Sequence, residues 1–444
     1  RFLPGPGVVT VGAREFLIAY NVNLNTRDKS QANDLAMEIR EKGRAVRINA
    51  RTPYYSSGQL LRYRSDQGIW PSGITAEVFS SLEELDQHLR THGTSLEKEA
   101  DFFGQDVSSL DGEMVMKRGM FQHCRAVGWV IPEYGRAQIS INLTDFHVTN
   151  MHHVFDACRQ LAEDRGLIIT GSELVGVAPY PAIRESGEHY LSNQGSSRGI
   201  PVKDIIATAV QSLGLSDISD FDPKRSVLGM AATDGPLTRH PVNDFVDEVS
   251  RDSPAPGGGS IAALAGSLGA ALSSMVANLT FAKRKYRKRQ SEMESIAIQA
   301  QLLKDDLLRA VDQDTEAFEG VIKAMRLPQS NPEQKQARAN AIEVGYRHAT
   351  EVPLVTAELC LEVMKLALQA SQRGLPAGIT DAGTATWMAR AGLEGAILNV
   401  RVNLVEVKDE KWRTAIEEQI QTLQEDSQGL LEQCQQQLEE ILGS

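Results

Sequence analysis

An uninterrupted stretch without charged side chains, from Gly257 to Ala282, constrains the fold of this chain more than any other feature of its sequence. The stretch is long enough to span a bilayer, but Gly, Ala and Ser dominate it and Asn278 lies within it. Insertion into a membrane would therefore be unfavourable. The sequence favours a helix in a protein interior, and we expect no membrane partner.

Two stripes at helical spacing support that interpretation. Larger apolar residues form the first stripe, which consists of Leu264, Leu268, Leu272, Met275 and Leu279. Small residues form the second, which consists of Ala262, Gly266, Ala270, Ser273 and Ala277. A helix with these two faces can be approached closely by a neighbour and covered on both sides, so we predict the central helix of a bundle.

Three glycines and a serine open this stretch. Ser260 is a natural N-cap, and Gly257, Gly258 and Gly259 can adopt positive φ and bring backbone N–H groups close to a ligand. Together with the partial positive charge of a helix N-terminus, they predict a site for an anion or a polar ring. The alternative is a loop that is tight only because of packing.

A cluster of cations from Lys283 to Arg289 follows the same stretch. These side chains either stabilise a helix C-terminus and face solvent, or they bind the polyanionic tail of a substrate. The chain as a whole is acidic, with a net charge of −12, which argues against a general nucleic-acid binder.

The next predicted helix carries an acidic side chain on its apolar face. The apolar stripe of this helix consists of Leu303, Leu307, Val311, Phe318, Val321 and Met325. Asp314 falls on the buried face, whereas Asp312 falls on the solvent face. Because burial raises the pKa of a carboxyl group into a range useful for proton transfer, Asp314 is either a catalytic residue or a core carboxylate that bridges helices.

Three more polar residues near the end of the chain are candidates. Asp381 falls at a predicted helix start, where the simplest role is that of an N-cap. Asn399 and Asn403 are four residues apart and share one helix face. Their amides could reach one ligand or one neighbouring helix.

The chain divides into two dissimilar halves. The first half follows the order β-α-β-β-α-β, which predicts an α+β ferredoxin-like (split βαβ) domain. Its expected elements are a strand at 16–24, a helix at 31–42, a hairpin at 127–131 and 137–143, a helix at 148–165 and a strand at 167–179. Helical periodicity dominates the second half, which predicts an all-α helical bundle domain that ends in a long helix at 410–442.

The predicted domain limits follow from these patterns. The ferredoxin-like domain covers 17–228, with a loop-rich insertion at 52–115 that contains one helix near 81–92. A linker at 229–242 leads to the helical domain at 243–444. The four cysteines lie far apart without a CxxC pair, which fits a cytoplasmic protein and argues against both disulfides and a zinc site.

Several of these motifs resemble the formiminotransferase-cyclodeaminase family. Its cyclodeaminase domain is similar to residues 243–444, through APGGGSIAALAGSLGAALSSMV, VDQDTEAF, TDAGTA and ILNVRVNL. The C-terminal subdomain of its formiminotransferase domain is similar to the first half, through GAREFLIAYNVNL, GWVI, QISINLTDF and GSELVGVAP.

The resemblance implies a bifunctional folate enzyme of histidine degradation. One activity moves a formimino group from N-formimino-L-glutamate to tetrahydrofolate, which leaves L-glutamate. The other converts 5-formimino-tetrahydrofolate to 5,10-methenyl-tetrahydrofolate and ammonia. The family's cyclodeaminase base is the second Asp of DxDxEAF, which is Asp314 here, the residue that the helix-face argument also selects.

The resemblance also implies polyglutamylated tetrahydrofolate as the carrier, no metal, and a homo-oligomer of dimers or rings of dimers. Residues 1–16 are expected to end the folate-binding segment of the transferase. The residues expected to bind folate are Arg1, Phe2, Leu3, Pro4, Gly5, Pro6, Gly7, Gly257, Gly258, Gly259, Ser260, Lys283, Arg284, Asp381 and Asn399.

One motif of the family is missing from this sequence. The transferase histidine of the family lies in a GEHPR motif, whereas the His-Pro pair of this sequence is His240-Pro241 in the predicted linker. We therefore expect that the N-terminal formiminotransferase subdomain is absent, that the sequence begins partway through a larger protein, and that this chain alone lacks transferase activity.

Three other functions remain compatible with these residues. The helical half could hydrolyse methenyl-tetrahydrofolate as a cyclohydrolase. The chain could be a folate-binding scaffold without turnover, or a structural protein that assembles through its long helices.

Overall fold

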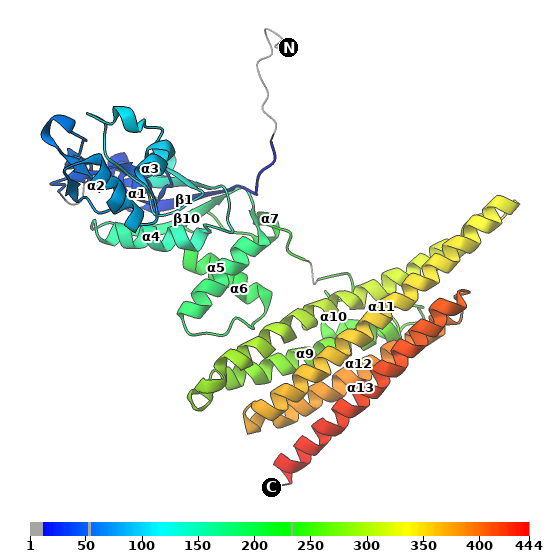
Figure 1. Cartoon of the computed structure of the whole chain (residues 1–444). Helices are drawn as coiled ribbons and strands as arrows, with labels where there is room; N and C mark the ends of the chain where they lie inside the picture. Colours follow the sequence, from blue (N-terminus) through cyan, green and yellow to red (C-terminus); the bar gives the residue numbers. More distant parts are fainter. Residues whose placement is uncertain (1–11, 52–54, 232–233, 444) are drawn as a thin grey trace. The chain divides into compact units, whose positions relative to one another are not determined.

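A computed structural model describes residues 12–51, 55–231 and 234–443 of the chain. These residues form two compact units, whose elements are shown in Figure 1. The first unit comprises the residues up to 190 together with 205–230, and the second comprises 191–204 together with the residues from 231 onward.

The first unit is built on an antiparallel sheet with the strand order β10-β1-β9-β8. The strands are β1 (Ile18–Leu24), β8 (Cys124–Ile131), β9 (Arg136–Leu143) and β10 (Ile169–Val175). Helices α1 (Lys29–Ile39) and α4 (Met151–Glu163) contact each other and cover one face of this sheet. The predicted order of these six elements is confirmed.

Local sequence signals explain where these two helices begin. Asp28 caps α1 by accepting a hydrogen bond from the Ser30 N–H at 2.8 Å. Asn150 caps α4 and forms a capping box with His153. Helix α1 then packs so tightly on β8 that a Cβ at Gly128 would lie 2.0 Å from the Asn33 backbone nitrogen, so this position admits only glycine.

The segment between α1 and β8 has secondary structure of its own. Its strands are β2 (Arg44–Ala45), β3 (Arg47–Ile48), β4 (Gln59–Leu60), β5 (Trp70–Pro71), β6 (Val78–Phe79) and β7 (Met116–Lys117). The predicted helix near 81–92 is confirmed as α2 (Leu82–Thr91). Helix α3 (Leu96–Phe103) was not predicted, although the N-cap Ser95 and the left-handed Gly104 mark its two ends.

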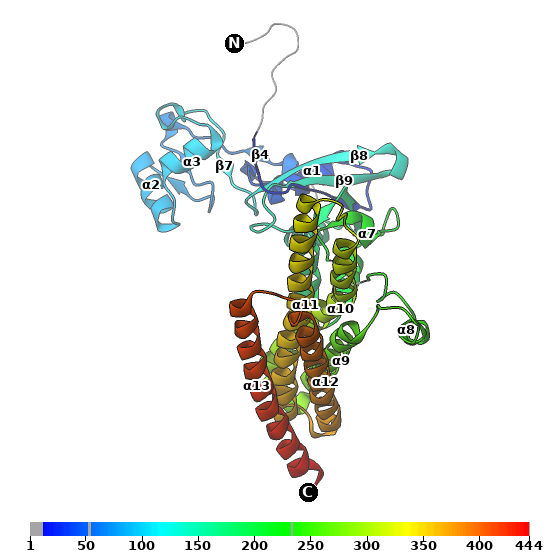
Figure 2. The same cartoon turned by 90° about the vertical axis from the view of Figure 1, so that its right-hand side faces the viewer.

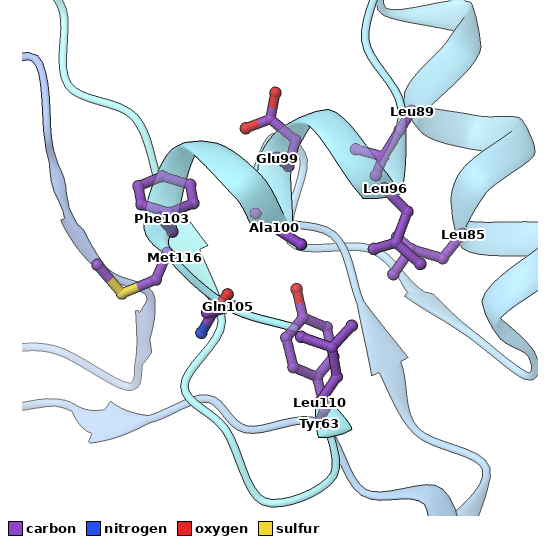
Figure 3. A pocket seen from close by; sticks show the side chains of 11 residues that line it. Tyr63, Leu85, Leu89, Leu96, Glu99, Ala100, Phe103, Gln105, Leu110 and Met116 are labelled. Atoms are coloured by element: carbon purple, nitrogen blue, oxygen red, sulfur yellow. The ribbon is translucent and has the colours of Figure 1, made fainter. Parts of the chain in front are cut away.

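This inserted segment folds around a separate small core. The buried residues of that core are Val46, Tyr63, Trp70, Leu85, Leu89, Leu96, Leu110 and Val115. Figure 3 shows the side chains around a cavity of about 20 Å³ beside α3, which has room for a single water molecule. The segment is therefore more ordered than the loop-rich region that the sequence predicted.

A short segment within the predicted domain at 17–228 packs with the helical unit instead. It connects α5 (Tyr180–Asn193) to α6 (Val202–Leu213). The Arg198 guanidinium and backbone N–H donate to the Glu294 carboxylate at 2.9–3.1 Å, and the Gly199 carbonyl accepts from the Asn278 amide at 2.7 Å. Sequence patterns did not separate this segment because its partners lie about a hundred residues away. The first unit also contains α7 (Pro223–Ser226), and its strand β11 (Ala178–Pro179) pairs with β12 (Val227–Leu228).

The second unit is helical, as predicted. Its helices are α8 (Val242–Val249), α9 (Gly258–Phe281), α10 (Gln290–Met325), α11 (Pro332–Arg373), α12 (Ile379–Leu404) and α13 (Glu410–Leu442), with short 3₁₀ turns at Arg284–Arg289 and Pro376–Gly378. Figure 2 shows α9 to α13 running alongside one another. The bounds of α13 match the prediction.

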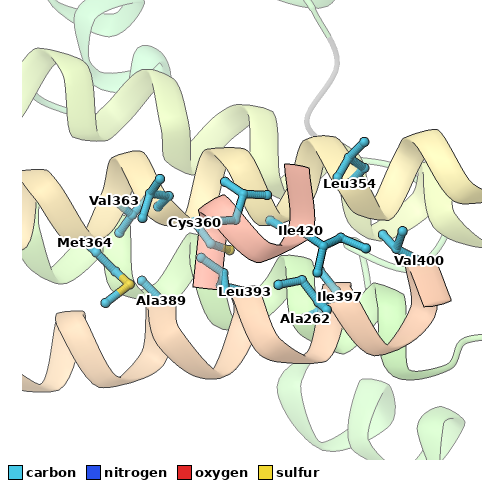
Figure 4. Packing of buried hydrophobic residues seen from close by; sticks show 14 of the residues in the cluster. Ala262, Leu354, Cys360, Val363, Met364, Ala389, Leu393, Ile397, Val400 and Ile420 are labelled. Carbon is cyan, nitrogen blue, oxygen red and sulfur yellow. The ribbon is translucent and has the colours of Figure 1, made fainter. Parts of the chain in front are cut away.

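The small-residue stripe of α9 is buried in this bundle, as predicted, and Figure 4 shows Ala262 among the core side chains. A Cβ at Gly266 would lie 2.5 Å from the Cys360 sulfur, and one at Gly269 would lie 2.8 Å from the Ala385 carbonyl oxygen. Because these glycines lack a side chain, α11 and α12 can approach α9 closely.

The prediction that α9 is covered on both sides is wrong for the face that carries its larger apolar residues. Leu268, Met275 and Leu279 are 47%, 39% and 45% exposed, so this face is open within one chain. By length and composition α9 could cross a membrane, although 61% of its most apolar window is buried in the bundle.

Asn403 has a structural partner on α11, where Pro353 interrupts the backbone hydrogen bonds. Proline has no N–H to donate to the carbonyl of Ala349, four residues earlier. The Asn403 side-chain amide donates to that carbonyl instead, at 2.7 Å. The sequence left either a ligand or a neighbouring helix as the partner of the Asn403 amide, and the structure shows the neighbouring helix α11.

This arrangement predicts a coupling between Asn403 and Pro353 in stability. Asn403→Ala should lower the free energy of unfolding by about 1–3 kcal/mol, because a carbonyl loses its donor. In a Pro353→Ala background the new backbone N–H can serve that carbonyl, so the same substitution should cost less. Urea unfolding of the four proteins measures this difference, and an equal cost in both backgrounds would contradict the assignment.

Candidate active site at the start of helix α9

Asp314 lies half-buried in the middle of α10, beside the first turn of α9. The fully buried Ser260 hydroxyl lies 3.2 Å from Asp314 Oδ2, 2.8 Å from the Val311 carbonyl oxygen and 3.3 Å from Thr315 Oγ1. Sequence reasoning missed Thr315, although it directly follows Asp314. The structure thus brings together residues more than fifty positions apart.

The Asp314 carboxylate occupies the space that a side chain at position 259 would need. A Cβ at Gly259 would lie 2.0 Å from Asp314 Oδ1, and a Cβ at Gly258 would lie 3.0 Å from the Asn399 amide nitrogen. The glycine turn is therefore in contact with α10 on one side and α12 on the other. Space, rather than backbone conformation, requires glycine at position 259.

Two expectations about the glycine turn are wrong in detail. The backbone of Gly257, Gly258 and Gly259 does not adopt positive φ. Helix α9 begins at Gly258 with Gly257 as its N-cap, so Ser260 lies inside the first turn. The Ser260 hydroxyl points to α10, because α10 passes close enough to supply its hydrogen-bond partners.

Burial raises the pKa of the Asp314 carboxyl group above its ordinary value, and desolvation is the largest cause. The Ser260 hydroxyl and backbone N–H favour the ionised form and lower this pKa by a smaller amount. The net increase moves the carboxyl group toward the range in which one side chain can accept and then return a proton near neutral pH.

Asn399 lies at the edge of this group, on α12. Its amide nitrogen donates to the Gly395 carbonyl of its own helix at 2.8 Å. The Asn399 side chain lies beside Gly258, where a Cβ would be only 3.0 Å from the amide nitrogen. Asn399 can therefore present a polar oxygen beside the glycine turn.

The expectation that Asp312 simply faces solvent is wrong. Its carboxylate accepts hydrogen bonds from the Leu237 N–H at 2.7 Å and from the Thr238 hydroxyl at 3.0 Å. Asp312 thus holds the segment before α8 against α10. The helical period placed it away from the core, but it could not show that a distant segment covers this face.

Three predicted site residues are not brought to Asp314 within one chain. Lys283 and Arg284 follow the end of α9, which spans 24 residues and hence about 36 Å from the glycine turn. Asp381 lies in the first turn of α12, about 27 Å along that helix from Asn399. Gly378 precedes this helix as its N-cap, so Asp381 is not the predicted cap. The candidate residues Arg1 to Gly7 lie outside the described residues.

The face of the sheet opposite α1 and α4 carries a hollow lined by polar and apolar side chains. This hollow of about 330 Å³ is lined by Asn21, Trp129, Ile131, Glu133, Glu173 and Val175. The Asn21 amide donates to Glu173 at 3.2 Å, and the Trp129 indole donates to Gln138 at 3.1 Å. The neighbouring Asn23 accepts a hydrogen bond from the Gln138 amide, and its own amide donates to Asp217 at 3.0 Å.

Comparison with known proteins identifies the family. A family model described as formiminotransferase-cyclodeaminase matches residues 241–422, and one described as formiminotransferase domain matches residues 83–231. Methenyltetrahydrofolate cyclohydrolase of Methylorubrum extorquens is 38% identical over 183 residues, which are 41% of this chain and 86% of that protein. The chain belongs to the formiminotransferase-cyclodeaminase family.

Other members of this family extend the similarity over both units. Formimidoyltransferase-cyclodeaminase of Sus scrofa is 29% identical over 427 residues, which are 95% of this chain and 66% of that protein. The chain thus spans about two thirds of the length of such relatives. Formiminotetrahydrofolate cyclodeaminase of Thermotoga maritima, a solved structure, is 26% identical and aligns with a TM-score of 0.42 over 46% of this chain and 99% of its own.

The family models and the sequence relatives confirm the resemblance to a bifunctional folate-enzyme family. They lend no support to the expectation that the N-terminal formiminotransferase subdomain is absent, since the formiminotransferase model matches residues 83–231.

Proposed function

We propose that the helical unit is a cyclodeaminase, which converts 5-formimino-tetrahydrofolate to 5,10-methenyl-tetrahydrofolate and ammonia. One observation carries this proposal: a half-buried carboxyl group of raised pKa, Asp314, lies directly against the glycine turn at the N-terminus of α9. The names and sequences of the relatives support the same reaction.

In this reaction a single carboxyl group serves twice. The folate N10 attacks the formimino carbon, and Asp314 accepts the proton that N10 loses. The protonated Asp314 then returns this proton to the amino group on the same carbon. The bond from the carbon to that nitrogen breaks, ammonia leaves, and the methenyl bridge remains.

The surrounding groups bind the polar edge of the ligand in this proposal. Backbone N–H groups at the start of α9 face the turn, where the helix dipole favours a polar or anionic group. Asn399 contributes a side-chain amide from α12. Lys283 and Arg284 have no contact with this ligand in the same chain, because α9 separates them from Asp314.

The test is an assay of the purified chain with 5-formimino-tetrahydrofolate that records methenyl absorbance and ammonia together. Stoichiometric appearance of both supports the cyclodeaminase. The similarity to a methenyltetrahydrofolate cyclohydrolase favours a second candidate, in which water attacks the methenyl carbon. Loss of methenyl absorbance from methenyl-tetrahydrofolate, with no ammonia from the formimino compound, would establish that alternative. Tight folate binding with neither reaction would indicate a scaffold.

The first unit fits a folate-binding role in the transferase half. Its strand order β10-β1-β9-β8, with both helices on one face, supports a ferredoxin-like domain. The hollow beside Trp129 and Glu173 combines an aromatic ring with a carboxylate on the other face. We assign this hollow to a folate or formimino-glutamate substrate.

The open apolar stripes of α9 and α12 support a homo-oligomer. These helices pack against each other, and both have exposed large apolar residues. The residues are Ile261, Leu268, Met275 and Leu279 on α9, and Trp387, Leu398 and Val402 on α12, with Val405 directly after that helix. Apolar surface of this extent is stabilised by burial against a partner, and a second copy of the bundle offers the same surface.

This proposal predicts the effect of charge on that surface. The double substitution Leu268→Glu and Leu398→Glu should shift the chain to monomers in sedimentation velocity, because two carboxylates would be buried at the interface. Val344→Glu on α11, at a residue that is 67% exposed, is the matched control and should leave the mass unchanged. A wild-type monomer at micromolar concentration would contradict the proposal.

A further inference from the structure

The proposed reaction, on which this inference rests, requires Asp314 to be ionised in one step and protonated in the next. A carboxylate accepts hydrogen bonds, whereas a protonated carboxyl group is a weaker acceptor and gains a donor. In a buried site, a partner that suits one state can be left without a bond in the other, at a cost in free energy.

We propose that Ser260 is a positioning residue: its hydroxyl, shared between Asp314 Oδ2 and the Val311 carbonyl oxygen, orients the carboxyl group and follows its change of protonation state. A hydroxyl has one hydrogen to donate and two lone pairs to accept with. The two acceptors lie 3.2 and 2.8 Å from the same Ser260 oxygen, so rotation of one hydrogen changes the acceptor.

The surroundings fit both states. When Asp314 is ionised, Ser260 donates to Oδ2 and the carboxylate is held in one orientation. Oδ1 then lies against Gly259, where a Cβ would be only 2.0 Å away. In this proposal Oδ1 is the oxygen that exchanges the proton with the ligand. When Oδ1 is protonated, Oδ2 becomes a weaker acceptor and the hydrogen can turn to Val311.

Thr315 completes this arrangement from the same helix as Asp314. Its hydroxyl lies 3.3 Å from the Ser260 oxygen and can donate to a lone pair in both states. Ser260 is fully buried, so its hydroxyl acts through Asp314 rather than by direct contact with folate. We propose this role in place of the direct folate contact that the resemblance implies for Ser260.

The inference is tested by the pH dependence of Ser260→Ala. Loss of a donor to the carboxylate should move the midpoint of the acidic limb of kcat by about one pH unit toward higher pH. Ser260→Cys, which keeps the volume with a weaker donor, should move it by an intermediate amount. Thr315→Val, the matched control, should move it much less.

A second measurement reads the same carboxyl group without turnover. For each protein, the free energy of unfolding is compared with that of its Asp314→Asn derivative between pH 4 and pH 8. The pH at which this difference stops changing should be higher in Ser260→Ala than in the wild type.

The outcomes separate this inference from the proposed function. A lower kcat with an unmoved limb, or an equal shift in Thr315→Val, would overturn the role of Ser260. Absence of ammonia release from the wild type would instead contradict the proposed function, and the unfolding measurement would still decide whether Ser260 sets the proton affinity of Asp314.

Discussion

Asp314→Asn is expected to reduce ammonia release by about 10²–10⁴-fold, the usual contribution of general acid–base catalysis. The amide has the size of the carboxyl group but cannot exchange a proton with the folate. The measurement is kcat for ammonia and methenyl formation, with folding checked by circular dichroism. Turnover at the wild-type rate would remove Asp314 from the mechanism.

The same substitution should not weaken the fold at pH values above the pKa of Asp314 in the folded protein. Because burial raises the pKa of Asp314, ionisation costs the folded state free energy that the unfolded chain does not lose. The free energy of unfolding of the wild type should therefore fall as pH rises from the pKa of the unfolded carboxyl to that of the folded one. The free energy of unfolding of Asp314→Asn lacks this pH dependence. The variant should therefore gain stability relative to the wild type above this pH window, and this gain should disappear below it.

Asp312→Asn on the same helix is the matched control for this experiment. Its side-chain oxygen can still accept from Leu237, so the segment before α8 stays attached. We expect turnover to remain within a few-fold of the wild type, because Asp312 takes no part in the proposed proton transfer. If Asp312→Asn lost as much turnover as Asp314→Asn, the effect would reflect the loss of a negative charge on α10 and not a specific role of Asp314.

Gly259→Ala is expected to lower turnover by about 10²-fold, which is the cost of displacing a catalytic group by an ångström. The new Cβ would lie 2.0 Å from Asp314 Oδ1, so the carboxyl group or the whole first turn of α9 has to move. Steady-state kinetics should show the loss mainly in kcat, because the reacting oxygen is displaced while the rest of the binding surface is kept.

The neighbouring glycines provide graded controls. A Cβ at Gly257 meets only the Pro254 carbonyl oxygen at an ordinary 3.7 Å, whereas one at Gly258 lies 3.0 Å from the Asn399 amide. We therefore expect the loss of activity to increase from Gly257→Ala to Gly258→Ala to Gly259→Ala. Equal effects at all three positions would show that backbone flexibility, rather than space beside Asp314, is what the turn requires.

Sequence patterns were most informative for features that depend on the geometry of a single helix, such as the face on which a residue lies. The period of α10 was sufficient to place Asp314 on its inner face, because the angle between residues on one helix is set by the backbone. The small-residue stripe of α9 was predicted to be buried for the same reason. Neither pattern could show that the larger stripe of α9 stays exposed, because exposure depends on which neighbours are present.

The roles of individual polar residues were harder to predict from the sequence. Ser260 has the residue type of an N-cap, but α10 lies close enough to bind its hydroxyl instead. Asn403 is explained only by the carbonyl that Pro353 leaves without a donor on another helix. In each case the partner is far away in the chain, and residue type alone does not select it.

The sequence by itself determined the two-part architecture, the helical core around α9 and the choice of Asp314, since each depends on local periodicity and short motifs. Only the tertiary structure decided which candidates meet. Gly259, Ser260 and Asp314 converge because α9 and α10 pack side by side at that level, whereas Lys283 is held about 36 Å away by the length of α9. The physical reason is that contacts between helices depend on their packing, and local spacing does not specify that packing.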